Sequence, residues 1–291
     1  MIQGGDGPAD AGLSGLPRYP RGARDRRRAS RRSLLIAIAS SVVVFGLIGW
    51  LVVSSPGWAL VQQSFFDPKY IGTSWPRQVA AVAVNIQLFL IAEACILPLA
   101  LFIAVLRSLP GPVFVPVRAM ALVYTDVFRG VPSVLFIFLL GFGVPALGVD
   151  WLPNDPFFWG VVTLVLVYSA YVSEVYRAGI ESVHPSQAAA ARSLGLTHLQ
   201  TMRHVVIPQA VRRVIPPLLN DFIGLQKDTA FVSFIGVIEV FRQAQVDESA
   251  SFNFTPYLVT AFLFLLLTVP LIHVTDWLVA RDRSRLLAGT P

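Results

Sequence analysis

The sequence is poor in charge and nearly lacks cysteine. Charged residues make up 14% of the 291 positions, whereas hydrophobic residues make up 55%. Soluble domains carry about 25% charged residues, so this chain has too few charges to cover a water-exposed surface. Its single cysteine, Cys95, excludes a disulfide framework within the chain. These scarcities favour an integral membrane protein.

Two kinds of site motif are also missing from the sequence. No G-x-x-x-x-G-K-[ST] loop is present to cradle phosphates, so any ATP has to be hydrolysed on another polypeptide. Three of the four histidines share one loop, but no cysteine or carboxylate completes a ligand set at metal spacing. We therefore predict a chain without an ATPase site, a metal or another cofactor.

Long apolar runs are what the chain does contain. Six are near the length of about 20 residues that a helix needs to cross a bilayer: Ser33–Val53, Val79–Leu106, Ala119–Phe142, Phe157–Tyr176, Pro216–Ile238 and Pro256–Leu278. The runs are too long and continuous for barrel strands. We therefore predict an all-α integral membrane protein with six transmembrane helices. No internal repeat is visible, so six spans suggest half of a pathway that a second subunit completes.

Lysine and arginine are distributed unevenly between the loops. If the N-terminus is inside, 18 of the 23 lie on the cytoplasmic side, three lie outside and two lie within spans. Positive residues accumulate in cytoplasmic loops, so both termini are predicted to be cytoplasmic. The net charge of +6 is then a consequence of membrane topology and does not indicate nucleic-acid binding.

The N-terminal tail, residues 1–32, is rich in glycine, proline, aspartate and arginine and is predicted to be disordered. Its end, SRRSLLI (Ser30–Ile36), is similar to a twin-arginine export signal. The apolar run that follows is longer than a usual signal segment, and no A-x-A cleavage site follows it. We therefore interpret residues 33–53 as an uncleaved transmembrane helix and residues 54–78 as an extracytoplasmic connection.

Charges within the predicted spans need partners, because a charge at mid-bilayer costs at least about 2.5 kcal/mol. They are Asp126, Arg129, Glu174, Lys227 and Asp228. Asp126 and Arg129 are expected to face each other on one helix, which Pro132 kinks. Lys227 is expected near mid-membrane, with Asp228 pointing elsewhere. These groups either form ion pairs that hold the bundle or line a substrate path, and the sequence leaves both interpretations open.

The long loop of residues 177–215 has the pattern helix, glycine turn, helix. Pro185 suits the first turn of a helix, QAAAARSL continues it, and Gly195 fits its C-terminal stop. Thr197 and Gln200 match a capping box that begins a second helix. On that second helix, Leu199, Met202 and Val206 are expected on one face, and Pro208 is expected to limit its continuation.

Two other interpretations of this loop are a DNA-reading helix-turn-helix and an amphipathic helix lying on lipid. A membrane span tethers the loop on both sides, which hinders docking into a major groove. Arginine together with leucine is, however, compatible with a lipid surface.

The loop resembles the EAA loop of ATP-binding-cassette importer permeases. That pattern is E-A-A, three residues, G, nine residues and I-x-L-P; here it runs from Ala189-Ala190-Ala191 through Gly195 to Val205–Pro208. Every spacing agrees, and Ala189 replaces the family's glutamate. Three further segments are similar to motifs of the polar amino acid permeases: Tyr124–Pro132, Ser169–Val183 and Ile215–Val240.

The resemblance covers about Ala80 to Arg281 and implies a type-1 permease domain, residues 79–281, with five helices. The helix at 33–53 is then an extra one, and residues 282–291 form a cytoplasmic tail. The family places its coupling loop in a groove of a cytoplasmic ATPase. The residues implicated here are Ala189, Ala190, Ala191, Arg192, Gly195, Arg203 and Pro208.

The resemblance also implies a bacterial inner-membrane importer of polar amino acids with a second permease subunit, an extracytoplasmic amino-acid-binding protein and surrounding lipid as partners. A zwitterionic substrate needs an acceptor for its ammonium group, for which Glu174 or Asp126 is suited. Its carboxylate needs a donor, for which Lys227 or Arg129 is suited. Asp228 and the neutral groups of Tyr171, Thr229 and Ser233 complete the candidates for the substrate path.

Two alternative functions belong to other classes. A small homodimeric ion-coupled carrier or channel would need no ATPase, but it has no use for the loop. A membrane-anchored DNA-binding regulator would require a separable loop domain, which this loop is too short to form.

Overall fold

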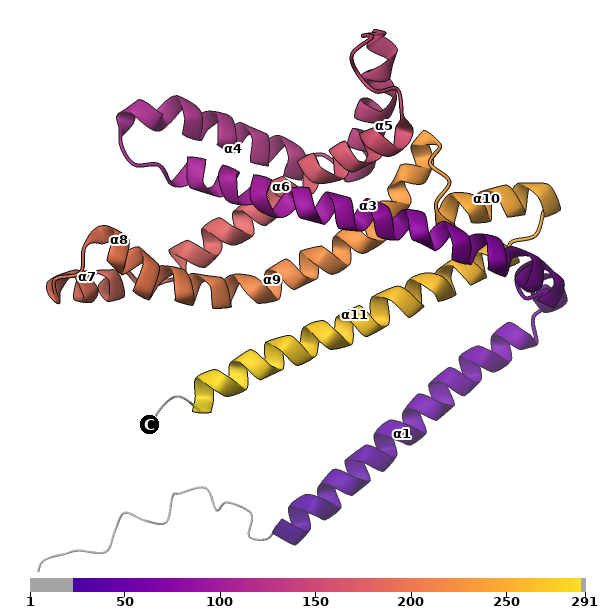
Figure 1. Ribbon diagram of the computed structural model, residues 1–291. Coiled ribbons are helices and arrows are strands. Elements are labelled where there is room, and N and C mark those ends of the chain that lie inside the picture. The colour runs from indigo at the N-terminus through magenta and orange to yellow at the C-terminus, as the bar shows by residue number, and fades with distance from the viewer. Residues whose placement is uncertain (1–22, 289–291) are drawn as a thin grey trace, which may run out of the picture. The chain divides into compact units, whose positions relative to one another are not determined.

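The computed structural model describes residues 23–288, with side chains for residues 35–281. Every regular element in this part of the chain is helical (Figure 1), which confirms the all-α prediction. The chain divides into two compact units, Met1–Leu60 and Val61–Pro291.

The first unit contains helix α1 (Ala23–Val53), whose stretch Leu35–Val53 is long and apolar enough to cross a membrane. The helix begins at Ala23, so the part of the predicted disordered tail between Ala23 and Arg32 is helical. Arginine and alanine are strong helix formers, which extends the helix into the basic flank. The rest of that tail, residues 1–22, lies outside the described residues.

The second unit is built on the long helices α3 (Pro68–Ser108) and α6 (Pro156–Glu181), which pack along each other. Both begin with the same signal: an aspartate side chain accepts backbone N–H groups at the cap, and proline occupies the first turn. The short helix α2 (Trp58–Phe65) precedes α3, so much of the predicted connection 54–78 is helical.

The predicted span Ala119–Phe142 is two helices, α4 (Val115–Gly130) and α5 (Ser133–Gly143), rather than one. Short 3-10 turns, η1 (Pro112–Phe114) and η2 (Pro145–Leu147), flank the pair, and its two arms are bent by 105°. Proline has no N–H to donate and forces the residue before it out of the helical region. The expected kink at Pro132 is therefore a complete break.

The predicted span Pro216–Ile238 is not a single helix either. Helix α9 (Ile207–Asp228) begins earlier, and a 3-10 turn, η4 (Thr229–Ile235), follows it and ends at Gly236 with φ +95°. Within residues 23–288, four helices are long and apolar enough to cross a membrane, or five if the bent pair counts as one span. Helix α9 is not among these spans, because it contains the charged residues Arg212, Arg213, Asp221, Lys227 and Asp228.

The chain ends with α10 (Val240–Ser251) and α11 (Thr255–Ala288), both of which pack against α3. Helix α11 continues beyond the predicted span Pro256–Leu278, so the predicted tail is helical as far as Ala288. In Figure 1, the short helices α7 (Pro185–Ser193) and α8 (His198–Thr201) lie at the end where α6 leads into α9.

Helix α6 is at the centre of the core. Its buried residues pack with those of α3, α5 and α9 in one apolar cluster: Phe89, Ala92, Ile96, Ala100, Phe136, Leu164, Val167, Tyr168, Val172 and Leu225. Two glycines allow close contact on the face toward η4 and α9. A Cβ on Gly160 would lie 2.0 Å from Cγ1 of Val232, and one on Gly179 would lie 2.0 Å from Cγ2 of Val214. This close packing positions the polar residues of α6 beside those of α9.

Candidate functional site

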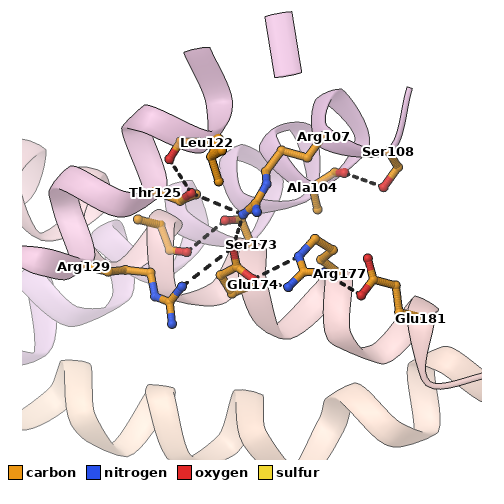
Figure 2. A network of polar contacts seen from close by, with 11 residues as sticks. Ala104, Arg107, Ser108, Leu122, Thr125, Arg129, Ser173, Glu174, Arg177 and Glu181 are labelled. Carbon is orange, nitrogen blue, oxygen red and sulfur yellow. Dashed lines mark hydrogen bonds and ion pairs between the residues drawn. The ribbon is translucent and has the colours of Figure 1, made fainter. Parts of the chain in front are cut away.

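Glu174 of α6 is the centre of a charge cluster that joins three helices. Its Oε1 accepts a hydrogen bond from Arg107 of α3, and its Oε2 accepts from Nε and Nη2 of Arg177 at 3.0 and 2.8 Å. Arg129 of α4 forms a longer ion pair of 3.7 Å with Oε1. Figure 2 shows the three guanidinium groups directed at this one carboxylate. Both oxygens of Glu174 are therefore occupied.

The cluster carries more positive than negative charge. Besides Glu174, Arg177 also forms an ion pair with the exposed Glu181 at 2.5 Å. Arg107 also donates a hydrogen bond to Thr125 at 3.2 Å. Side-chain exposure is 12% for Arg107 and 16% for Glu174, but 42% for Arg129. The cluster thus has a buried side on α3 and an open side on α4.

The open side borders a cleft of about 450 Å³ between α6 and α9. Arg129, Tyr171 and Glu174 line it on one side, and Arg213 and Asp221 line it on the other. Arg213 donates to the carbonyl of Ser182 and so ties α9 to the end of α6. The volume is in the range of small-molecule sites, and groups of both charges converge on it.

Not every predicted path residue lies at this cleft. Asp126 is exposed on α4. Arg129 pairs with Glu174 of α6, so the predicted pair of Asp126 and Arg129 on one helix is not formed. Tyr171 lies at the cleft, where its ring is 5.8 Å from the Arg129 guanidinium and its hydroxyl donates to the Arg129 carbonyl at 3.4 Å. Arg129 is on α4, whereas Tyr171 and Glu174 are on α6, so sequence spacing along one helix could not predict that they meet.

The second group of predicted path residues lies near the end of α9. Lys227 is exposed, whereas Asp228 points elsewhere, as predicted, and accepts from the Tyr168 hydroxyl at 2.8 Å. Thr229 and Ser233 are buried in η4. Thr229 donates to the carbonyl of Gln226 at 2.7 Å, so it belongs to a structural network away from the cleft.

That network contains a carboxylate that the sequence analysis did not select. Glu239 is fully buried and accepts from the N–H groups of Phe241 and Arg242 at 2.9 and 2.7 Å. The amide of Asn85 on α3 donates to Glu239 at 2.9 Å and to Thr229 at 3.0 Å. Burial raises the pKa of the Glu239 carboxyl, while these donors lower it. The group caps α10 and joins it to α3.

Asp221 and Glu93 are further carboxyl groups that sequence reasoning missed. Both interrupt apolar runs that were predicted as spans, and a charge in such a run is a sufficient signal to select a residue. One oxygen of Asp221 is buried without a hydrogen-bond partner among the described residues. Within the segment Ile215–Val240 the family motif reads L-P-P-L-x-N-x-F, and Asp221 stands at the second variable position, so the resemblance did not mark it.

The loop between α6 and α9 has the predicted helix–glycine–helix form. Helix α7 begins at Pro185, and Gly195 follows it with φ +89°. The N–H of Gly195 donates to Arg192 O at 2.9 Å and that of Leu196 donates to Ala191 O at 3.2 Å, which is a Schellman stop. The capping box of Thr197 and Gln200 begins α8, as predicted.

The second loop helix departs from the prediction in two respects. Leu199 is exposed, and only Met202 and Val206 pack against the body of the protein. Pro208 does not end the helix, because a π-helical turn, η3 (Met202–Val206), connects α8 to α9. The wider turn accommodates a residue without an N–H. Leu194 and Leu199 are left 82% and 77% exposed on either side of Gly195.

Comparisons with known proteins agree with this geometry. Residues 96–284 match the family described as binding-protein-dependent transport system inner membrane component. The chain is 37% identical over 170 residues to a probable glutamine ABC transporter permease protein, GlnM, of Bacillus subtilis (strain 168), covering 58% of this chain and 77% of the relative. It is 34% identical over 233 residues to the L-cystine transport system permease protein TcyB of the same organism, covering 79% and 93%.

A solved crystal structure of an amino acid ABC transporter with histidines has a similar fold. Its TM-score is 0.68 at 33% sequence identity, and the similarity covers 74% of this chain and 98% of that one. The matched region contains the charge cluster, the cleft and the helix–glycine–helix loop. The chain therefore belongs to the family of binding-protein-dependent transport system inner membrane components.

Proposed function

We propose that this chain is the membrane-spanning permease subunit of an ATP-driven importer for polar amino acids. Family membership supports the transport class, and the names of the glutamine and L-cystine permeases support amino acids as substrates. The chain forms half of the translocation path and performs no chemistry itself. A second permease subunit, identical or different, completes the path.

The observation that carries this proposal is the exposed loop around Gly195. Ala189, Ala190 and Arg192 are exposed, whereas Ala191 is buried and Ala188 packs against the cluster of Val183, Val206 and Ala210. Exposed leucines beside an arginine are suited to a protein partner rather than to water. In our proposal this surface docks in a groove of a cytoplasmic ATPase, and Arg192 and Arg203 pair with acidic groups there.

The proposed topology has both termini in the cytoplasm, on the positive-inside rule. The loop and the ATPase then lie on the cytoplasmic side of a bacterial inner membrane, and an amino-acid-binding protein delivers substrate on the other side. Ala189 stands where the family has glutamate, so one polar contact to the ATPase is absent. Ala189→Glu is expected to retain or strengthen copurification with the ATPase.

Gly195→Val is the decisive variant. A β-branched residue is strained at φ +89°, so α7 should be misplaced while the transmembrane helices insert normally. Reconstituted with the ATPase and binding protein, this variant should lose ATP-driven uptake and the stimulation of ATPase activity by loaded binding protein. Gly111→Val is the matched control, because Gly111 has φ +93° in another loop with open space around it.

Normal coupling in Gly195→Val would remove the main support for this function. Uptake that needs an ion gradient and no ATPase would instead favour the alternative, a small homodimeric carrier or channel. Liposomes that contain the permease alone, with sodium or proton gradients imposed, distinguish the two mechanisms.

A further inference from the structure

We infer that the cleft between α6 and α9 holds the amino and carboxylate groups of the transported amino acid, with Asp221 accepting from the ammonium and Arg129 donating to the carboxylate. The inference rests on the proposed function and adds Asp221 as a residue that binds the substrate.

The first argument concerns which carboxylate is free. Glu174 lines the cleft, but Arg107 and Arg177 already donate to its two oxygens, and Arg129 pairs with it at 3.7 Å. An incoming ammonium group would have to displace a guanidinium group. Asp221 also lines the cleft, and no hydrogen bond to its carboxyl group is found among the described residues. Asp221 is thus the better acceptor.

The second argument concerns the need of Asp221 for a partner. A carboxyl group inside a helical bundle that has no hydrogen bond is unfavourable and rare. Asp221 lies close enough to Arg129 and to Glu93 to interact electrostatically with both. A bound ammonium group would satisfy the carboxyl group and reduce the repulsion between Asp221 and Glu93.

The third argument concerns Arg129. It forms an ion pair at 3.7 Å but donates no hydrogen bond within the described part of the chain, and its side chain is 42% exposed. Its guanidinium group lies over the Tyr171 ring, which holds the planar group at the cleft. A guanidinium group with free donors is suited to bind a carboxylate through two parallel hydrogen bonds.

Arg129 and Asp221 therefore provide one donor group and one acceptor group in the same cleft, which is what an amino acid zwitterion requires. The substrate side chain would occupy the remaining space beside Ala178 and Pro217. Recognition of the common amino and carboxylate groups is consistent with relatives named for different amino acids.

The test measures binding to the purified permease–ATPase complex without the binding protein. A panel of radiolabelled common L-amino acids and L-cystine is first screened on the unsubstituted complex. The best-bound member is then competed with its desamino analogue, which lacks the ammonium, and with its α-carboxamide, which lacks the carboxylate. Both analogues should bind the unsubstituted complex about 10- to 100-fold more weakly than the amino acid.

In Asp221→Asn, binding of the amino acid should fall by about 10- to 100-fold, while the desamino analogue should bind within about 3-fold of its affinity for the unsubstituted complex. In Arg129→Gln, binding of the amino acid should likewise fall by about 10- to 100-fold, while the α-carboxamide should bind within about 3-fold of its affinity for the unsubstituted complex. Asp276→Asn on α11 is the control and should leave all affinities unchanged. Asparagine removes a buried charge without changing shape, so Asp221→Asn is expected to fold, and the exposed Arg129 gives a second variant that is independent of core packing.

Equal losses for the amino acid and both analogues would overturn the inference and give Asp221 a structural role. Unchanged affinities in Asp221→Asn would overturn it as well, while uptake by the unsubstituted complex keeps the proposed function intact. If the unsubstituted complex neither binds nor takes up any member of the panel, the proposed function itself fails.

Discussion

Glu174 and Glu239 are both carboxylates within the helical bundle, but their partners are of opposite kinds. Glu174 is surrounded by three arginines from three helices, beside a cleft. Glu239 is fully buried and is held by two backbone N–H groups and one side-chain amide. Three guanidinium groups compete for two oxygens in the first cluster, whereas each donor has a definite acceptor in the second.

This difference indicates different roles for the two clusters. Charged partners attract over a range of distances, so Arg107, Arg129 and Arg177 can exchange contacts with Glu174 if α4 or α6 moves. The backbone donors to Glu239 act only at short range and in one direction. The Glu174 cluster is therefore compatible with rearrangement, whereas the Glu239 cluster fixes α10 against α3.

The largest expected effect is that of Glu239→Ala. It leaves the N–H groups of Phe241 and Arg242 without an acceptor in a buried site and the Asn85 amide with Thr229 as its remaining acceptor, which should cost roughly 3–5 kcal/mol. The thermal midpoint of the detergent-purified protein measures this loss. Glu248→Ala on the same helix is the control and should change the midpoint little. A small change in Glu239→Ala would mean that water replaces the carboxylate and that α10 is not fixed by it.

Glu174→Gln should have a smaller effect of about 2–3 kcal/mol. Among the residues with described side chains, it removes the only carboxylate that contacts Arg107, whose side chain is 12% exposed. The cleft admits water, so part of that loss is recovered. Glu181→Gln is the control: this exposed partner of Arg177 should contribute at most about 0.5 kcal/mol. If Glu174→Gln lowers the thermal midpoint as much as Glu239→Ala, the distinction between the two clusters is lost.

The pH dependence of stability should also separate the clusters. The folded-state pKa of Glu239 is raised by burial, so the folded protein retains a proton that the unfolded chain has released. Stability from this group is therefore present below the unfolded pKa of about 4.3 and decreases as pH rises through the folded value. Glu239→Gln does not titrate at this site. Its thermal midpoint should improve relative to the unsubstituted protein as pH rises from about 5 to 8, and parallel curves would contradict the assignment.

Lys227→Met should have the smallest effect on stability, within about 0.5 kcal/mol. Lys227 is exposed and forms no ion pair among the described residues, so it belongs to neither cluster. Amino acid uptake, measured together with the thermal midpoint, then decides the role of Lys227. Lost uptake at normal stability would place Lys227 on the substrate path, and a large loss of stability would reveal a structural partner in the second subunit.

Local chemistry made the helix–glycine–helix loop of residues 177–215 predictable from the sequence. Pro185, Gly195 and the capping box of Thr197 and Gln200 each act on the backbone within a few residues, and all four have the predicted roles. The continuation of the helix past Pro208 was not predictable in this way, because the π-helical turn that accommodates the proline also depends on packing of Met202 and Val206 against the bundle.

The sequence by itself determined the membrane class, the apolar runs and the glycine turn, because length, composition and backbone preference act locally. Only the tertiary structure decided which charges meet. Arg107 and Glu174 are 67 positions apart, and Arg129 of α4 pairs with Glu174 of α6 instead of with Asp126 on its own helix. Asp221 differs from Glu174 in what packs around it, since no arginine among the described residues lies within hydrogen-bond range of it. The partners of a charge are set by helix packing, which no short stretch of sequence encodes.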